Sequence, residues 1–258
     1  MKFFNAIIFS NIWISIGAIG TTTAFYRFIG QEINFYYLTL VFFATLFAYN
    51  FQYISEQTSN DDRQKQTSWI TLNLKFIKIL TITSFFICVF LSLYIFTPLL
   101  LLVSSPVFLL VFFYKKGTFN KLSLRNIPLA KIIIIAFCWM CSCSIIPGLI
   151  SNELISVKMS LYIFLYVIAI TLPFDIRDYH FDNESIITIP HLFGAKATYF
   201  LSIIILFFLF IMSLENYGLL LFISISLIII LPSYKLRSEY YYLFILDGLL
   251  LVFPIFVT

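Results

Sequence analysis

The stretch KMSLYIFLYVIAITLPFDIRDYHFD, residues 158–182, contains the two features that decide the fold. Its first part, 158–175, is almost wholly apolar, and a helix of that length spans about 27 Å at about 1.5 Å per residue. The hydrocarbon core of a bilayer is about 30 Å thick, so this helix is long enough to cross it. The stretch then ends in three carboxylates, Asp175, Asp178 and Asp182. It therefore predicts a membrane-spanning helix with an acidic stripe at one end.

The rest of the chain has the same apolar character. Of its 258 residues, 61% are hydrophobic and only 11% are charged, and the mean hydropathy is +1.00. A soluble domain carries about 25% charged residues, so this composition excludes a soluble globular protein. The net charge of +4 does not indicate a nucleic-acid partner, because Lys and Arg are scattered between apolar runs. We expect an all-α, polytopic membrane bundle in which residues 1–258 form one integral-membrane domain.

Nine apolar runs are long enough, or nearly so, to cross the membrane as helices. They are 4–26, 33–54, 70–92, 95–114, 129–150, 158–175, 197–214, 217–233 and 240–257. Only residues 94–97 separate the third run from the fourth, so a tight hairpin is expected there and a count of eight stays open.

The Lys and Arg residues predict the orientation. With nine spans and a cytoplasmic N-terminus, all 16 of them except Arg27 and Lys158 fall on the cytoplasmic side, as the positive-inside rule requires. The long polar connections 55–69, 115–128 and 176–196 fall on the same side. We therefore expect a bacterial-type inner-membrane protein with its C-terminus outside and its function at the cytoplasmic face.

The three aspartates of the stripe have the spacing of a helix face. At i, i+3 and i+7 they fall within about 60° of one another, whereas Arg177 and His180 are expected to point elsewhere. At about 6 Å and an effective dielectric constant of about 20, each pair of carboxylates repels by roughly 3 kcal/mol. A cation is therefore expected nearby, and Mg²⁺ is suited because one or two carboxylates hold it together with substrate phosphates. The alternative is a solvated helix end, where the repulsion falls below about 1 kcal/mol.

The stripe and the segment after it resemble a known family. The pattern D-x-x-D-x-x-x-D, followed by Thr188-Ile-Pro-His-Leu-Phe-Gly-Ala-Lys196, is similar to the second aspartate motif of the UbiA superfamily of intramembrane prenyltransferases and the "TLPxLLG" segment after it. The stretch Phe113-Tyr-Lys-Lys-Gly-Thr118 resembles the tyrosine–lysine–threonine region between the fourth and fifth helices of that family. The resemblance implies nine helices with an active site that faces the cytoplasm.

The resemblance also implies a reaction and the residues that carry it. Mg²⁺ and basic side chains would grip a prenyl diphosphate, and the isoprenoid group would pass to an aromatic or other hydrophobic acceptor in the membrane. By match of motif, Asp175, Asp178 and Asp182 would hold the metal. The residues expected to contact the substrate are Asn50, Tyr53, Tyr114, Lys115, Lys116, Arg125 and Lys196.

The first aspartate motif of the family, N-D-x-x-D-x-x-x-D, is only partly matched. Asn50 agrees, but the three aspartate positions hold Phe51, Ile54 and Thr58. Asn50 and Tyr53 share a helix face, so the surface stays polar but becomes neutral. Two metals around a diphosphate need two clusters of carboxylates, and one cluster is missing. A non-catalytic relative that binds isoprenoid lipid or a partner protein is therefore the alternative to a one-metal prenyltransferase.

Two further features have competing interpretations. Asp247 lies in the last apolar run, where a carboxyl group faces the bundle interior; it either lines a cavity or makes a structural hydrogen bond. Cys138, Cys141 and Cys143 lie close together in an apolar run, where metal-binding thiolates are disfavoured, so we expect them to pack as small apolar residues. A small transporter is less expected, because the sequence lacks the inverted repeats and broken helices of that class.

Overall fold

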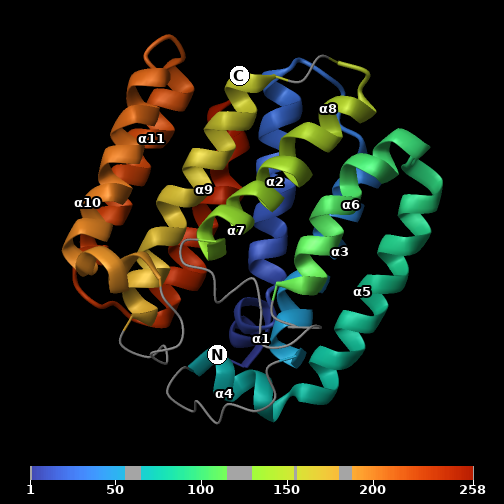
Figure 1. The fold of residues 1–258 in the computed structure, drawn as a ribbon, viewed down its shortest axis with the longest axis horizontal. Coiled ribbons are helices and arrows are strands. Elements are labelled where there is room, and N and C mark those ends of the chain that lie inside the picture. Colours follow the sequence, from blue (N-terminus) through green and yellow to red (C-terminus); the bar gives the residue numbers. More distant parts are fainter. Residues whose placement is uncertain (1, 56–64, 115–129, 154–155, 180–187, 258) are drawn as a thin grey trace.

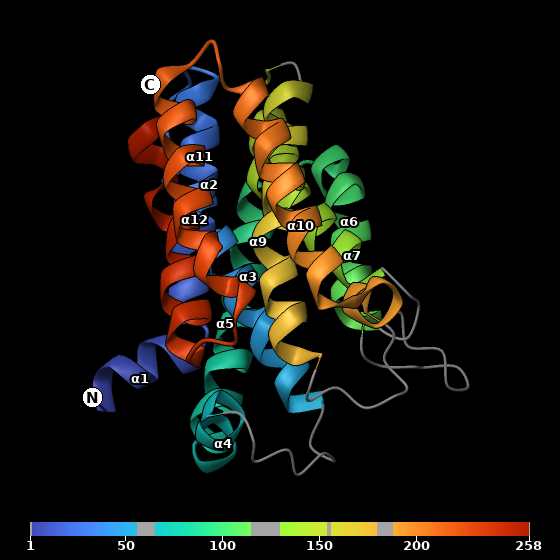
Figure 2. The ribbon, with the colours of Figure 1, turned by 90° about the vertical axis from the view of Figure 1, so that its left-hand side faces the viewer.

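A computed structural model shows the chain as a bundle of helices (Figures 1 and 2) and describes all residues except 1, 56–64, 115–129, 154–155, 180–187 and 258. The described residues form helices and connecting turns and contain no strand. The α-helices are α1 (Lys2–Phe9), α2 (Ile12–Phe28), α3 (Phe35–Ser55), α4 (Lys65–Leu72), α5 (Leu74–Ile95), α6 (Pro98–Phe113), α7 (Ala130–Met140), α8 (Ile146–Ile150), α9 (Val157–Asp178), α10 (Ile189–Met212), α11 (Tyr217–Ile230) and α12 (Asp247–Val252). Turns of π-helix (Cys141–Ile145 and Tyr241–Leu246) and of 3₁₀-helix (Leu231–Tyr234 and Phe253–Phe256) extend several of them. The predicted all-α fold is confirmed.

The lengths of the helices agree with a membrane protein. Within the described part of the chain, six helical stretches are long and apolar enough to cross a membrane, and the bent pair α1–α2 makes up to seven. Two shorter apolar helices, Pro98–Phe113 and Tyr241–Phe256, occupy the other expected runs. Each expected run therefore coincides with an apolar helix, while the number of nine spans stays a prediction. Helix α1 and the last turn of the chain lie at opposite ends of the bundle (Figure 2).

The expected run 4–26 is helical but not straight, because the helix breaks after its second turn. Helices α1 and α2 meet at an angle of 60°, and α1 lies across one end of the bundle (Figure 2). The break is at Asn11, whose φ of 64° is left-handed, a conformation that Asn tolerates better than most residues. The Asn11 side chain donates a hydrogen bond to Asn50 Oδ1 of α3 at 2.9 Å. Because this partner is distant in sequence, the apolar pattern gave no sign of the break.

Local signals mark the start of α6 and an interruption in α10. The Thr97 side chain accepts a hydrogen bond from Leu100 N at 3.3 Å, and Pro98 occupies the first turn of α6, as in a typical helix start. The predicted hairpin between α5 and α6 is thus present. Helix α10 begins at Ile189, earlier than the expected residue 197, and Gly194 interrupts it with a φ of 83°. Only glycine adopts that conformation without strain.

Helices α2 and α12 pack with their backbones in close approach. A Cβ atom placed on Gly20 would lie 2.5 Å from the backbone oxygen of Leu250. Small residues allow this kind of contact between membrane helices. Helix α2 also packs against α3 and lies in the middle of the bundle (Figure 1), so the contact joins the N-terminal and C-terminal parts of the chain.

We expect Gly20→Ala to destabilise the protein by about 1–3 kcal/mol, because the added methyl group meets the rigid backbone of α12. The thermal unfolding midpoint in detergent measures the effect. Gly248→Ala is the matched control on the opposite helix, since its Cβ would lie 3.5 Å from the Trp13 ring, an ordinary contact. Equal losses in the two variants would contradict the close approach at Gly20.

Candidate functional site

The last turn of α9 carries two of the three predicted aspartates. Asp175 is buried, with 1% of its side chain exposed, and Asp178 is 17% exposed. Both carboxylates lie near the same atom of another helix, as the predicted shared face requires. Asp182 falls outside the described residues.

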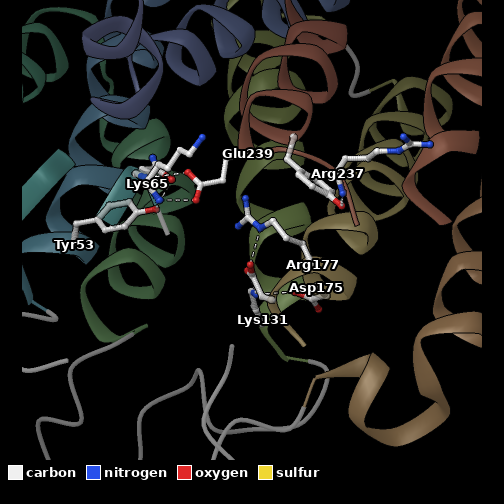
Figure 3. A network of polar contacts seen from close by, with 10 residues as sticks. Tyr53, Lys65, Lys131, Asp175, Arg177, Arg237 and Glu239 are labelled. Carbon is white, nitrogen blue, oxygen red and sulfur yellow. Dashed lines mark hydrogen bonds and ion pairs between the residues drawn. The ribbon is translucent and has the colours of Figure 1, made fainter. Parts of the chain in front are cut away.

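Lys131, near the start of α7, brings these two carboxylates together. Its Nζ atom lies 2.5 Å from Asp175 Oδ1 and 3.8 Å from Asp178 Oδ2. Figure 3 shows this ion pair at the polar end of the bundle. The sequence predicted a cation beside the stripe, and in the described part of the chain an ammonium group lies there. In the sequence, Lys131 is one of the basic residues that predict the orientation, and the same topology puts it at the same face as the aspartates.

Arg177 supplies a second cation, and the expectation that it points away from the stripe is wrong. Its Nε atom donates a hydrogen bond to Asp178 Oδ1 at 2.7 Å. The guanidinium group also lies over the rings of Phe174 and Tyr242, 5.3 and 5.2 Å from their centroids. The helical phase predicts only where the Cβ atom points, whereas the long side chain of Arg curls back along the helix. Arg177 is therefore held between two rings and a carboxylate.

The end of α3 faces this cluster with neutral groups. Asn50 is buried, accepts a hydrogen bond from Asn11 and donates one to Ser10 O at 3.0 Å. Gln66 of α4 donates to Asn11 Oδ1 at 3.1 Å and accepts from the Tyr53 hydroxyl at 2.9 Å. The position of the family's first aspartate motif is thus part of a neutral hydrogen-bond network that joins the α1–α2 break to α3 and α4.

A carboxylate closes the α4 side of this polar end. Glu239 accepts hydrogen bonds from the backbone N–H groups of Lys65 and Gln66 at 2.6 and 3.0 Å (Figure 3). It thereby occupies the start of α4, where the backbone N–H groups have no partner within the helix. Arg177 interacts electrostatically with both Tyr53 and Glu239, so the neutral network and the charged cluster form one polar layer.

The remaining predicted residues are spread around this layer. Tyr114 is buried directly after α6 and interacts electrostatically with Lys131. Lys196 is exposed on α10. Asp247 is partly buried at the start of α12, where it interacts electrostatically with Arg177. Lys115, Lys116 and Arg125 fall outside the described residues.

The cluster fits one divalent ion better than two. Across the described ranges, no group of three or more His, Cys, Asp or Glu side chains is placed to hold a metal. Asp175 and Asp178 converge on one cationic atom, Lys131 Nζ, and two carboxylates together with phosphate oxygens suffice for Mg²⁺. The described end of α3 offers amide and phenol groups in place of carboxylates, so the part of the chain that the structure describes shows no second acidic cluster there.

An apolar cavity of about 450 Å³ lies among α3, α5, α6 and α7. Its walls include Tyr49, Cys88, Cys138, Trp139 and Cys143. The volume falls in the range of small-molecule sites. Asp247, predicted as a cavity residue, is not among the residues that line it.

Helix α7 connects the cavity to the charged cluster. Lys131 and Cys138 are related as i and i+7, so they lie on nearly the same face of α7, about 10 Å apart along its axis. Tyr114 interacts electrostatically with both Lys131 and Tyr49, a cavity residue. The charged cluster and the apolar cavity therefore lie one after the other along α7. This arrangement suits a ligand with an anionic head and an apolar tail.

Comparison with known proteins gives the fold. No family model matches the sequence, and no curated protein matches it. Three solved structures of a UbiA homolog from Archaeoglobus fulgidus are similar in fold to this chain. Each is 13% identical to it, and each match covers 98% of both chains. They are the complex with GPP and Mg²⁺ (TM-score 0.67), the complex with DMAPP and Mg²⁺ (0.61) and the complex with Cd²⁺ (0.63).

These matches cover the chain from end to end, so the similarity is to the whole fold and is not confined to a few helices. Together with the long apolar helices, they identify an integral membrane protein. The fold that the aspartate stripe predicted is confirmed: this chain has the fold of the UbiA homologs.

Proposed function

We propose that the chain is a membrane prenyltransferase that binds a prenyl diphosphate and transfers its isoprenoid group to a hydrophobic, aromatic acceptor. The convergence of Asp175 and Asp178 on one cation, in line with an apolar cavity, carries the proposal. The A. fulgidus homologs that share the fold were solved with GPP or DMAPP and Mg²⁺, which supports this class of substrate.

In this proposal the two ends of the substrate bind to different parts of the bundle. Asp175, Asp178 and Asp182 would hold one Mg²⁺ ion, and the apolar cavity would take the isoprenoid tail. Lys131 and Arg177 lie beside the aspartates and add positive charge. The other proposed substrate contacts are Asn50, Tyr53, Tyr114, Lys115, Lys116, Arg125 and Lys196.

The reaction needs charge stabilisation more than proton transfer. The allylic C–O bond breaks and its electron pair leaves with the diphosphate, which creates an allylic carbocation in the cavity. The π electrons of the acceptor form the new C–C bond, and the proton that the acceptor loses passes to the diphosphate or to water. Bound Mg²⁺ supplies positive charge that offsets the charge developing on the diphosphate.

Product analysis tests this function. We expect the purified protein in nanodiscs, given geranyl diphosphate, Mg²⁺ and a set of membrane-soluble phenols and quinols, to release diphosphate and to form a prenylated product detectable by mass spectrometry. Release without any alkylated acceptor would show ionisation of the substrate with capture by water. Binding of geranyl diphosphate with neither release nor product would contradict a transferase.

The neutral network at the end of α3 favours one alternative, a non-catalytic relative that binds an isoprenoid lipid. Both polar groups of the Asn50 side chain are engaged with the α1–α2 break, where the family's first motif calls for metal ligands. In that case the protein binds geranyl diphosphate but does not release diphosphate. The product analysis above separates the two functions.

The cavity makes a prediction about the tail of the substrate. Ala44 of α3 lines the cavity, and Ala44→Trp adds a large ring to it. We expect this variant to bind geranylgeranyl diphosphate at least tenfold more weakly, while its affinity for inorganic diphosphate stays unchanged, because only the tail is obstructed. Thr39→Trp is the matched control, since Thr39 is exposed on the same helix. If Ala44→Trp binds both ligands as tightly as the wild type, the tail lies elsewhere.

A further inference from the structure

Among the residues that the structure describes, Lys131 and Arg177 are the cations paired with the aspartates of α9, and their surroundings differ. The Arg177 guanidinium is enclosed between the rings of Phe174 and Tyr242 and donates to Asp178. Lys131 extends an unbranched side chain from the first turn of α7, and 17% of that side chain is exposed. Arg177 is therefore enclosed by two rings, whereas the unbranched Lys131 side chain is partly exposed.

The Lys131 ammonium lies between the two carboxylates, where a metal shared by them would also have to bind. It contacts Asp175 Oδ1 at 2.5 Å and Asp178 Oδ2 at 3.8 Å. Asp175 is almost fully buried, and a buried carboxylate is stable in its charged form only beside a cation. An ammonium and a divalent ion cannot occupy this position together.

We propose that Lys131 is a displaceable counter-cation: it neutralises Asp175 and Asp178 in the ligand-free protein and leaves them when a divalent ion arrives with the diphosphate. A metal ion alone has to displace the ammonium without giving it a new partner, so it binds weakly. A diphosphate offers phosphate oxygens, with which Lys pairs well. Metal and diphosphate therefore bind with positive coupling, and each raises the affinity of the other by the same factor.

This inference deepens the proposed function of the same site, and only its diphosphate half rests on that function. The competition between Lys131 and a metal concerns the protein and the ion alone. It can therefore be tested without any substrate and without activity.

The test compares the wild type and the Lys131→Met variant in nanodiscs. This substitution keeps most of the side-chain volume and removes the charge. Thermal unfolding is followed in EDTA and in Mg²⁺, and Mn²⁺ binding is followed by electron paramagnetic resonance. We expect the wild type to gain almost nothing from Mg²⁺ alone. We expect Lys131→Met to unfold roughly 6–12 °C lower in EDTA, to recover most of that loss in Mg²⁺, and to bind Mn²⁺ at least tenfold more tightly than the wild type.

The double variant Lys131→Met/Asp175→Asn is the control for a merely structural ion pair. Because it lacks the buried carboxylate, we expect it to be more stable in EDTA than Lys131→Met and to gain no stability from Mg²⁺. If Lys131→Met is equally unstable, or fails to fold, in Mg²⁺ as well as in EDTA, Lys131 is only a structural partner and the proposal is wrong. Unchanged stability and unchanged Mn²⁺ affinity in Lys131→Met would also overturn it.

The predicted coupling between metal and diphosphate binding is measured separately. For the wild type, we expect geranyl diphosphate to increase Mn²⁺ affinity at least tenfold, and Lys131→Met to lose most of that increase. If metal rescue occurs in Lys131→Met but geranyl diphosphate binds neither protein, the counter-cation role stands and the proposed function fails. If geranyl diphosphate raises Mn²⁺ affinity equally in both proteins, the displacement model fails and the proposed function stands.

Discussion

Asp178→Asn is expected to weaken the Mg²⁺-dependent binding of geranyl diphosphate about 100-fold. Loss of one member of a buried charge arrangement costs about 2–5 kcal/mol, and a factor of 100, about 2.8 kcal/mol, lies in the lower part of that range. Asp178 suits the test better than Asp175, because its side chain is 17% exposed whereas that of Asp175 is 1% exposed and pairs closely with Lys131. The variant should therefore fold.

The measurement is the thermal shift that geranyl diphosphate produces with and without Mg²⁺. Glu215→Gln is the control, because Glu215 is 89% exposed and pairs only loosely with Lys158, away from the cluster. We expect the Mg²⁺-dependent shift to disappear in Asp178→Asn and to persist in Glu215→Gln. A full shift in Asp178→Asn would remove this carboxylate from the site.

Arg177→Met is expected to lower stability by about 3–5 kcal/mol, because it removes the guanidinium from a buried ion pair. Met keeps part of the apolar volume between Phe174 and Tyr242, so lost packing contributes less than lost charge. The stability of Arg177→Lys should lie between those of the wild type and Arg177→Met. An ammonium group lacks the planar geometry with which a guanidinium stacks on rings while it binds Asp178.

Unfolding midpoints in detergent test this order. Arg237→Met provides the control, because Arg237 is exposed and its Nε donates to the backbone oxygen of Pro232 at 2.8 Å. We expect Arg237→Met to unfold like the wild type. Equal midpoints for Arg177→Met and Arg237→Met would mean that Arg177 contributes no more than a surface residue.

The sequence predicted those parts of the fold that local patterns encode. Apolar runs located the helices, and the short separation at residues 94–97 located the α5–α6 hairpin. The break at Asn11 was missed because it depends on Asn50 and Gln66, which are brought to it by the tertiary fold. No apolar period contains that information.

In the candidate site, too, the sequence predicted what local spacing encodes and missed what depends on the tertiary fold. Helical spacing placed Asp175 and Asp178 on one face, and their mutual repulsion predicted a cation beside them. The identity of that cation depends on the packing of α7 against α9. Lys131 and Asp175 are 44 residues apart in the sequence. Pairing every basic residue at the predicted cytoplasmic face with the stripe would have included Lys131. The curl of Arg177 onto two rings could not be inferred, because it depends on Tyr242 from the far end of the chain.

The most direct test of the account is equilibrium binding of radiolabelled geranyl diphosphate to the purified wild-type protein in nanodiscs, with Mg²⁺ and with EDTA. The account predicts saturable binding that is at least tenfold tighter in Mg²⁺ and that inorganic diphosphate displaces. Absence of binding under both conditions would contradict it, and the UbiA fold would then serve another ligand in this chain.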